Sequence, residues 1–319
     1  MSLDLEWDDA QQAVAAAVAH YARERWDDER TKALVDAGAF PDELWRDLSE
    51  LGVLAVMTPE GDGGAREAVA ALESLGRHAL PGPLVDTLVA TQLVAGDERA
   101  ALVQGRRVAV IATESLAPWP ERAESILLAE ASGLRRARVV RRRARLETTG
   151  GEPWGRVELE PGARFEDTAR ARAVGETALA ALLAAAGGEL VRRAVAHARA
   201  RQQFGRAIAE FQAVAHPLAD VQMAIDAARV LARTAACSLD DDPADAPARA
   251  SAARLSARRA ALEAAHVAHQ VFGAHGVTLE GPVFHLSRRI RQWASHPLPA
   301  DAQGVLAWML DETFREVRS

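Results

Sequence analysis

The chain has 319 residues, 49% of them hydrophobic and 26% charged, and a formal net charge of -7 at pH 7. A chain of this length and apolar content can bury a substantial core and has room for two or three domains. The acidic balance argues against a general affinity for nucleic acid, because nucleic-acid phosphates attract basic proteins. A single cysteine, Cys237, excludes an internal disulfide and a cysteine-based metal cluster, so we predict a reducing compartment and no metal site.

No uninterrupted apolar run in the sequence approaches the roughly 18 to 20 residues that a membrane span needs. The opening stretch, MSLDLEWDDAQQ, is acidic, whereas a secretory or transit peptide is basic. We therefore expect a soluble, cytoplasmic protein that does not associate with a membrane. One stretch departs from the acidic balance: RRARVVRRRAR, Arg135–Arg145. It predicts a solvated strand surface or, as the alternative, a docking site for an anionic ligand or partner.

Three kinds of hydrophobic pattern follow one another along the chain. Apolar residues recur at helical spacing in segments broken by GAFPDE, TPEGDGG and ALPGPL, which predicts a helical domain over residues 1–104. Short β-prone runs, VAVIAT, SILLAEA, ARVV, ARLETT and RVELE, then predict a small sheet domain over residues 105–169. Long helices rich in Ala, Leu and Val follow, which predicts a helical bundle over residues 170–319. The expected fold class is mainly α with a small β domain.

Two polar segments with glycine lie where long helices of the bundle should end. They are RQQFG, Arg201–Gly205, and QVFGAHG, Gln270–Gly276. Helix ends carry unpaired backbone N–H groups, glycine lets the backbone approach a ligand, and Arg and Gln side chains can donate to phosphate oxygens. These segments therefore indicate a site for a phosphate-bearing ligand, with simple helix caps as the alternative.

The same segments carry a family resemblance. The stretch RQQFGRAIAEFQAVAHPLAD resembles the Arg-x-Gln-Phe-Gly signature of the flavin-dependent acyl-CoA dehydrogenase family, and QVFGAHGVTLE is similar to its Gln-x-x-Gly-Gly-x-Gly-x-Thr-x-Glu stretch. The stretches FPDELWRDLSELGVLAVMTPEGDGG and LESLGRHALPGPL resemble its first helical domain. The resemblance covers about residues 3–104 and 170–296. It implies an N-terminal helical domain, a β domain and a C-terminal four-helix bundle, with FAD as cofactor and an acyl-CoA as substrate.

In that family, each FAD lies between two subunits, and the neighbouring chain holds its ADP part through these two motifs. The resemblance therefore implies a set of cofactor-binding residues in this chain. Arg201 would face the pyrophosphate, Gln203 and Phe204 would line the FAD, Gln270 would donate to the pyrophosphate, and Gly273 and Gly276 would allow close backbone approach. For Phe204, a role as a helix-packing anchor is the alternative.

The family reaction removes a proton next to the thioester carbonyl and therefore needs a glutamate base. Ungapped counting from Gln270 puts Pro297 on the usual base position, and proline offers neither a carboxylate nor an N–H. Some members place the glutamate before the Arg-x-Gln-Phe-Gly motif. Counting back from Arg201 reaches Gly175, with Glu176 beside it. Glu176 is the candidate catalytic residue, with a favourable position at a helix N-terminus as the alternative reason for its presence.

The β domain is shorter than is usual in the family, and the loops that normally wall the flavin ring are not recognisable. A chain that keeps the ADP clamp but lacks the ring walls and the usual base resembles the short subunit of a heteromeric, steroid side-chain type bacterial acyl-CoA dehydrogenase. This resemblance implies a larger homologous partner subunit and a role in lipid or steroid catabolism. Two alternatives stay open: a self-sufficient homo-oligomeric enzyme with Glu176 as base, and a non-enzymatic helical scaffold derived from the family.

Overall fold

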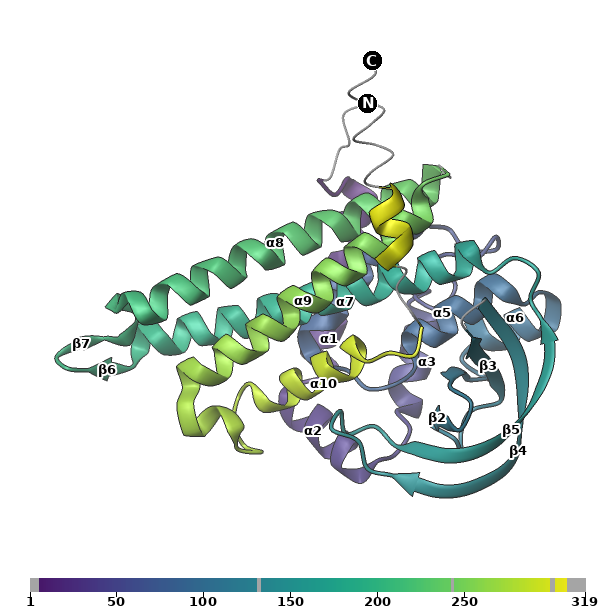
Figure 1. The fold of residues 1–319 in the computed structure, drawn as a ribbon, viewed down its shortest axis with the longest axis horizontal. Coiled ribbons are helices and arrows are strands. Elements are labelled where there is room, and N and C mark those ends of the chain that lie inside the picture. Colours follow the sequence, from purple (N-terminus) through teal and green to yellow (C-terminus); the bar gives the residue numbers. More distant parts are fainter. Residues whose placement is uncertain (1–5, 131–132, 242–243, 299–301, 309–319) are drawn as a thin grey trace, which may run out of the picture.

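The computed structural model describes residues 6–130, 133–241, 244–298 and 302–308. Helices come first, a small sheet follows, and long helices complete the chain (Figure 1). The predicted fold class is therefore confirmed, whereas the domain boundaries stay predictions. The first helices are α1 (Asp9–Arg25), α2 (Asp28–Ala37), α3 (Asp42–Glu50), α4 (Ala65–Leu75), η1 (Gly76–His78), α5 (Leu84–Leu93) and α6 (Gly96–Val103). The later ones are α7 (Ala169–Ala200), η2 (Ile208–Glu210), α8 (Gln212–Asp241), α9 (Ala246–Phe272), η3 (Gly273–Val277) and α10 (Phe284–Ala294).

Five strands form the main sheet, in the order β1-β3-β4-β5-β2. Strands β1 and β3 run parallel, and the other neighbours are antiparallel. Strands β6 and β7 form a separate hairpin between α7 and α8. The bounds are β1 (Ala109–Ala112), β2 (Leu116–Pro118), β3 (Ser125–Glu130), β4 (Gly133–Leu146), β5 (Trp154–Arg164), β6 (Gln202–Gln203) and β7 (Arg206–Ala207).

Strand β4 differs from the sequence-based expectation. The run ARVV and the first half of ARLETT, predicted as separate strands, belong to one strand of 14 residues that ends at Leu146. It pairs with β5 along most of its length, with three register shifts. The arginines between the two runs do not interrupt the strand, because their side chains lie on exposed surface while the backbone pairs with β5. An antiparallel sheet can keep one face in water, so arginines are tolerated there.

Helix α7 is the centre of the bundle. Among the described residues, it is the one helix long and apolar enough to cross a membrane, with a mean hydropathy of 1.4 over its most apolar window. That window is 83% buried inside the protein, which is typical of a core helix. Helices α8 and α9 lie along α7 (Figure 1), and all three meet closely at Gly187. A Cβ at Gly187 would lie 3.2 Å from the Cα of Ala261, closer than an ordinary van der Waals contact, so glycine favours this approach.

The first turns of α8 contain a proline. Helix α8 begins at Gln212 and continues through Pro217. The carbonyl of Phe211 accepts hydrogen bonds from the N–H groups of Val214 and Ala215, so the helix is established before the proline. A proline this close to the helix start removes few backbone bonds and is tolerated.

Candidate functional site

The RQQFG segment forms a tight hairpin at one end of the bundle. Helix α7 ends at Ala200, as predicted, and Phe204 and Gly205 form the loop between β6 and β7. Both residues have positive φ angles, 52° and 79°. This combination is typical of a type I′ turn, in which Asn-Gly is the usual pair. Phenylalanine is therefore an unusual residue at the first position.

Phe204 does not act as a packing anchor within the chain, because 92% of its surface is exposed. Its ring meets Phe211 only edge-on, with the ring centroids 6.1 Å apart. The left-handed backbone at Phe204 costs about 1–2 kcal/mol relative to a glycine or asparagine there. Neither the strained backbone nor the exposed ring stabilises the isolated chain. Both are typical of a residue that contacts something outside it.

The second signature segment lies against the first. Helix α9 ends at Phe272, and the imidazole of His197 on α7 stacks on its ring with centroids 4.3 Å apart. The N–H of Arg201 donates to the carbonyl of His197 over 2.9 Å, so the hairpin starts directly beside this stack. The structure thus brings the two predicted motifs to the same end of the bundle (Figure 1).

The predicted cofactor-binding residues at this end differ in exposure. The side chains of Arg201, Gln203 and Gln270 are exposed, and Gly273 turns the chain with a φ of 59°. Gly276 is buried instead. A Cβ there would lie 3.0 Å from the Cβ of Phe272, so the packing of η3 on α9 is sufficient to require this glycine. We name the exposed set, with Phe204, the clamp end.

The clamp end is cationic. Burial, together with the positive charges of Arg201 and His275, lowers the pKa of His197. The neighbouring Arg206 is exposed, and its guanidinium lies 4.2 Å from the ring centroid of Phe211. A groove of about 670 Å³ lies nearby between α9, η3 and α10, with Val277 and Leu279 63% and 59% exposed on its rim. Cationic donors beside apolar surface suit an anionic ligand with an aromatic part.

Glu176 lies far from the clamp end, in the first turns of α7. It is 2% exposed, and its carboxylate accepts a hydrogen bond from the hydroxyl of Ser251 on α9. Both residues line a cavity of about 640 Å³, together with Arg172. The Nε of Arg172 is buried and has no acceptor among the described residues. The cavity therefore combines a buried carboxylate, a hydroxyl and a guanidinium.

The two positions that the resemblance associates with the base are spatial neighbours. A Cβ at Gly175 would lie 2.6 Å from the Cδ2 of Leu298 and 2.6 Å from the Cγ2 of Val89. A glutamate at position 175 would therefore clash. Arg254 donates to the carbonyls of His296 and Leu298, which fixes Pro297 between them. Burial lowers the pKa of Arg254 to about 10, with the carboxylate of Glu176 opposing the shift.

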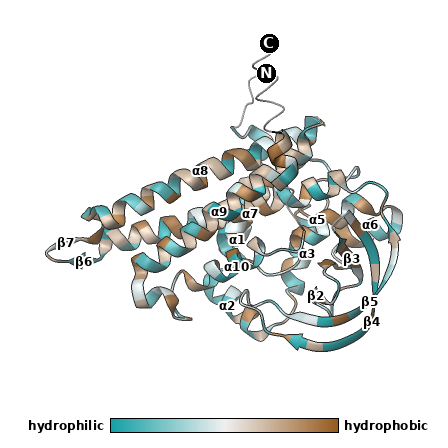
Figure 2. Cartoon of the chain, viewed as in Figure 1, coloured by the Kyte–Doolittle hydropathy of each residue, from teal (hydrophilic) through white to brown (hydrophobic). Residues whose placement is uncertain are grey.

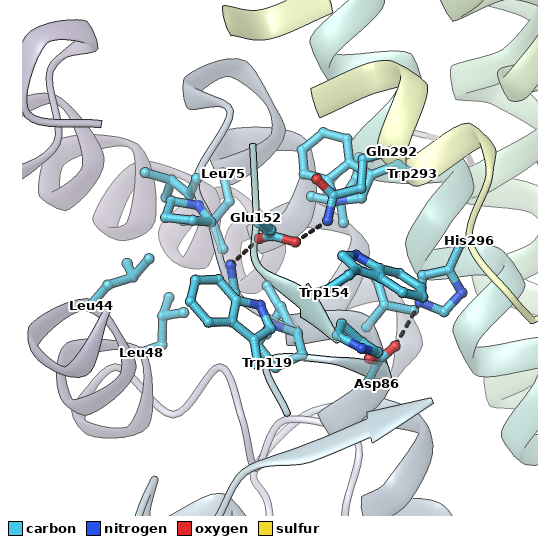
Figure 3. A pocket seen from close by; sticks show the side chains of 18 of the residues that line it. Leu44, Leu48, Leu75, Asp86, Trp119, Glu152, Trp154, Gln292, Trp293 and His296 are labelled. Atoms are coloured by element: carbon cyan, nitrogen blue, oxygen red, sulfur yellow. Dashed lines mark hydrogen bonds and ion pairs between the residues drawn. The ribbon is translucent and has the colours of Figure 1, made fainter. Parts of the chain in front are cut away.

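Pro297 itself lines a small cavity between the N-terminal helices, the sheet and α10 (Figure 3). The cavity measures about 50 Å³, room for about one water molecule and far below the roughly 300 Å³ of a ligand pocket. Tryptophans occupy the space around it, and Figure 3 shows Trp119, Trp154 and Trp293 gathered there. Trp119 also packs edge-on against Phe40, with centroids 5.3 Å apart.

Two polar pairs close this cavity. His296 Nε2 lies 2.6 Å from Asp86 Oδ1, and Figure 3 shows the two side chains joined across the wall. Glu152 forms an ion pair of 2.5 Å with Arg289, with side chains 5% and 2% exposed. The sequence analysis named none of these four residues, because they lie on segments distant in the chain and belong to no recognised motif. Among the described residues, no group of three His, Cys, Asp or Glu side chains is placed to hold a metal ion.

Sequence profiles of two domain families match the chain. The profile described as "Acyl-CoA dehydrogenase, N-terminal domain" matches residues 8–98, and "Acyl-CoA dehydrogenase, C-terminal domain" matches residues 170–294. The chain is 31% identical to the acyl-CoA dehydrogenase IpdE2 of Mycobacterium tuberculosis over 222 residues, which is 62% of this chain and 66% of that protein. It is 30% identical to the acyl-CoA dehydrogenase FadE34 of the same organism over 279 residues, 75% of this chain and 38% of that protein. The match thus spans less than two thirds of either relative.

Solved structures share the fold. A steroid acyl-CoA dehydrogenase variant, Tcur3481-Tcur3483 G363A, has a TM-score of 0.81 at 24% identity and covers 97% of this chain and 99% of its own. The ChsE4-ChsE5 complex of M. tuberculosis has a TM-score of 0.79 at 23% identity, with 98% and 99% covered. Butyryl-CoA dehydrogenase of Megasphaera elsdenii has a TM-score of 0.80 at 19% identity, with 97% and 100% covered.

Proposed function

The chain belongs to the acyl-CoA dehydrogenase family, and from that premise we propose that it takes part in the FAD-dependent α,β-dehydrogenation of an acyl-CoA thioester. We propose further that it acts as the short subunit of a heteromeric enzyme. In this role it holds the ADP part of an FAD whose flavin ring lies in a larger homologous subunit. When bound, FAD accepts a hydride from the substrate while a base takes the neighbouring proton.

The geometry of the clamp end supports this proposal most directly. Phe204 presents an exposed ring from a strained hairpin, next to the exposed donors Arg201, Gln203 and Gln270. A guanidinium can give two parallel hydrogen bonds to a pyrophosphate, and an aromatic ring can contact an adenosine. Arg201 would then bind the diphosphate, and Gln270 would orient it from the neighbouring helix end.

The region of Pro297 supports the assignment of the chemistry to the partner. The position that the resemblance gives to the base has no carboxylate, and the cavity beside it holds about 50 Å³. The Glu152–Arg289 pair and several tryptophans lie around this cavity. We therefore assign the base and the ring pocket to the larger subunit.

The names of similar proteins suggest a substrate class and an assembly. The titles of two solved structures with this fold speak of a steroid acyl-CoA dehydrogenase and of a complex between ChsE4 and ChsE5. We carry both ideas over as proposals, a bulky steroid-type acyl group and a heteromer in the cytoplasm. Helix α8 exposes two apolar side chains, Met223 (64% exposed) and Val230 (46% exposed). They are seven residues apart and lie on the same face of the helix. They suit a subunit contact.

Flavin content tests the clamp. The chain is purified alone and together with a larger homologous subunit, and FAD is measured by absorbance after release. We expect little FAD in the chain alone and stoichiometric FAD in the assembly. Arg201→Ala should lower flavin retention by the assembly about tenfold, a loss of one charge-assisted contact. The matched control is Arg229→Ala on α8, an exposed arginine that pairs with Asp226 one turn away. Equal retention in both variants would contradict the clamp.

A second candidate function rests on Glu176. Its buried carboxylate lines a cavity large enough for part of a substrate, so a homo-oligomer could carry its own base. A homo-oligomer with one FAD per chain would favour this enzyme. An assembly that never binds flavin, alone or with the larger subunit, would favour the scaffold instead.

A further inference from the structure

A groove on the sheet side of the molecule is independent of the clamp end. The β4–β5 ribbon bends away from the rest of the sheet, and Figure 1 shows it at the opposite end of the molecule from the β6–β7 hairpin. A groove of about 300 Å³ lies between this ribbon, the loop after β2 and the C-terminal end of α2. Its lining includes Gly38, Phe40, Trp119, Glu121 and five arginines.

The arginines give the groove an excess of positive charge. They are Arg122, Arg142, Arg143, Arg145 and Arg156, and Glu121 is the one acidic residue in the lining. Figure 2 shows the ribbon largely in the colour of hydrophilic residues. Guanidinium groups placed this close together repel one another unless anions neutralise them. The groove thus provides a local positive field on a chain of net charge -7.

Three of the arginines are already neutralised by neighbours. Arg122 lies 2.7 Å from Glu124, Arg143 lies 2.7 Å from Glu158, and Arg142 lies 3.5 Å from Glu121. These pairs hold the positively charged wall in place.

The other two arginines keep most of their donors free. The backbone of Arg156 lies in β5, and its exposed side chain makes no hydrogen bond or ion pair with another described residue. Within the described part of the chain, the Arg145 side chain makes one hydrogen bond, to the carbonyl of Gly38 over 3.5 Å. Gly38 has a φ of 57°, which favours glycine, and the Arg145 guanidinium lies in the space that a Cβ would occupy there. Two guanidinium groups with free donors therefore border one groove.

The apolar part of the groove carries a strained residue. Trp119 has a positive φ of 48°, and its Nε1 is buried without an acceptor among the described residues. Phe40 contacts it edge-on, and the guanidinium of Arg122 lies 5.1 Å from the Phe40 ring centroid. Backbone strain and unpaired buried donors are enriched at binding sites.

We propose that this groove binds the phosphate or diphosphate group of a small molecule. Arg145 and Arg156 supply the N–H donors that match phosphate oxygens, and the ion-paired Arg142 and Arg143 form the wall beside them. The aromatic wall allows contact with an organic part of the ligand. The volume suits a small anion or a nucleotide-sized group rather than a protein surface.

Calorimetric titration of the full chain, alone or in its assembly, with inorganic pyrophosphate at low salt tests the proposal. We expect saturable binding that weakens as salt is added, and a loss of about tenfold or more in the double variant Arg145→Ala, Arg156→Ala. Arg138→Ala is the matched control, because Arg138 lies on β4, pairs with Glu160 and does not line the groove. Arg201→Ala should leave binding unchanged, which separates this site from the clamp.

Two outcomes would overturn the site. One is the absence of saturable pyrophosphate binding. The other is an equal loss in Arg138→Ala, which would mean that the ribbon attracts anions through its overall charge. Titration with ADP then identifies the source of the phosphate. If ADP binds more tightly than pyrophosphate, and Phe40→Leu lowers the affinity for ADP to that for pyrophosphate, the ligand is a nucleotide. If the two bind equally tightly, the ligand is a free inorganic anion.

Discussion

The ring of His197 stacks on the ring of Phe272 with 4.3 Å between centroids and 26° between planes. This contact joins the end of α7 to the end of α9, and each helix continues from it into one of the two signature segments. The aromatic pair therefore lies where the two signature segments leave the bundle.

The pH dependence of the clamp end should follow from this pair. The pKa of His197 lies below its ordinary value of 6.5, because burial and the charges of Arg201 and His275 disfavour the imidazolium. The unfolded chain therefore binds a proton more readily than the folded one. The contribution to stability is complete above about pH 6.5 and decreases as the pH falls toward the folded-state pKa.

His197→Phe should remove this pH dependence, because a phenyl ring stacks but does not titrate. Hydrogen exchange of residues 196–208 between pH 5 and 7.5 measures the effect. In the original chain, protection of this segment should fall at acid pH, whereas in the variant it should change less. His20→Phe, an exposed site on α1, is the control. If protection in His197→Phe still fell at acid pH as in the original chain, the pH dependence would belong to another titrating group.

Phe204→Asn should separate stability from flavin retention. Asparagine tolerates the left-handed conformation, so the variant chain should be more stable by about 1 kcal/mol in urea unfolding. The assembly should meanwhile retain less FAD, because the exposed ring is lost. Phe204→Ala is the matched comparison: it also loses the ring but keeps the strained φ of 52°. Undiminished flavin in both variants would show that the ring makes no contact with the cofactor.

The buried pair of Glu152 and Arg289 should be a major source of stability. Glu152 also accepts a hydrogen bond from the N–H of Gly82 over 2.5 Å, so its removal deprives the buried Arg289 of its carboxylate partner and the Gly82 N–H of its acceptor. We expect Glu152→Ala to lower the free energy of unfolding by about 3–5 kcal/mol. Glu60→Ala, whose side chain is 68% exposed in its pair with Arg99, should change it by less than about 0.5 kcal/mol. If Glu152→Ala lowered the free energy of unfolding as little as Glu60→Ala does, the Glu152–Arg289 pair would be exposed to solvent.

Sequence alone predicted the helices and their ends well, because Gly and Pro mark the breaks and the apolar residues of the bundle have a helical period. The end of α7 at Ala200 and the nearby start of α8 follow from that pattern. Strand β4 was predicted as two shorter runs, because an arginine-rich stretch has no apolar alternation to indicate a strand. Its pairing with β5 is a long-range interaction.

For the sites too, the sequence indicated contiguous motifs but not contacts between distant segments. The two signature segments were recognisable because each is a contiguous motif, but their contact through His197 and Phe272 depends on how the helices pack. Asp86 and His296 are 210 residues apart in the chain, and neither belongs to a motif. Only the folded chain brings such pairs together. The sequence alone therefore could not show that the cavity beside Pro297 is small.

Glu176→Gln should decide where the base lies. Glutamine has nearly the same shape and can still accept a hydrogen bond from Ser251, so the cavity should persist while the proton acceptor is lost. If the larger subunit supplies the base, turnover of the assembly should stay within about twofold of the original, whereas loss of a catalytic base typically lowers turnover by about 10²–10⁴. Steady-state rates with an acyl-CoA substrate and an artificial electron acceptor measure the difference. Ser251→Ala, which removes only the hydroxyl, controls for changes in packing. A large loss in Glu176→Gln alone, with flavin content unchanged, would place the chemistry in this chain and make the cavity between α7 and α9 the active site.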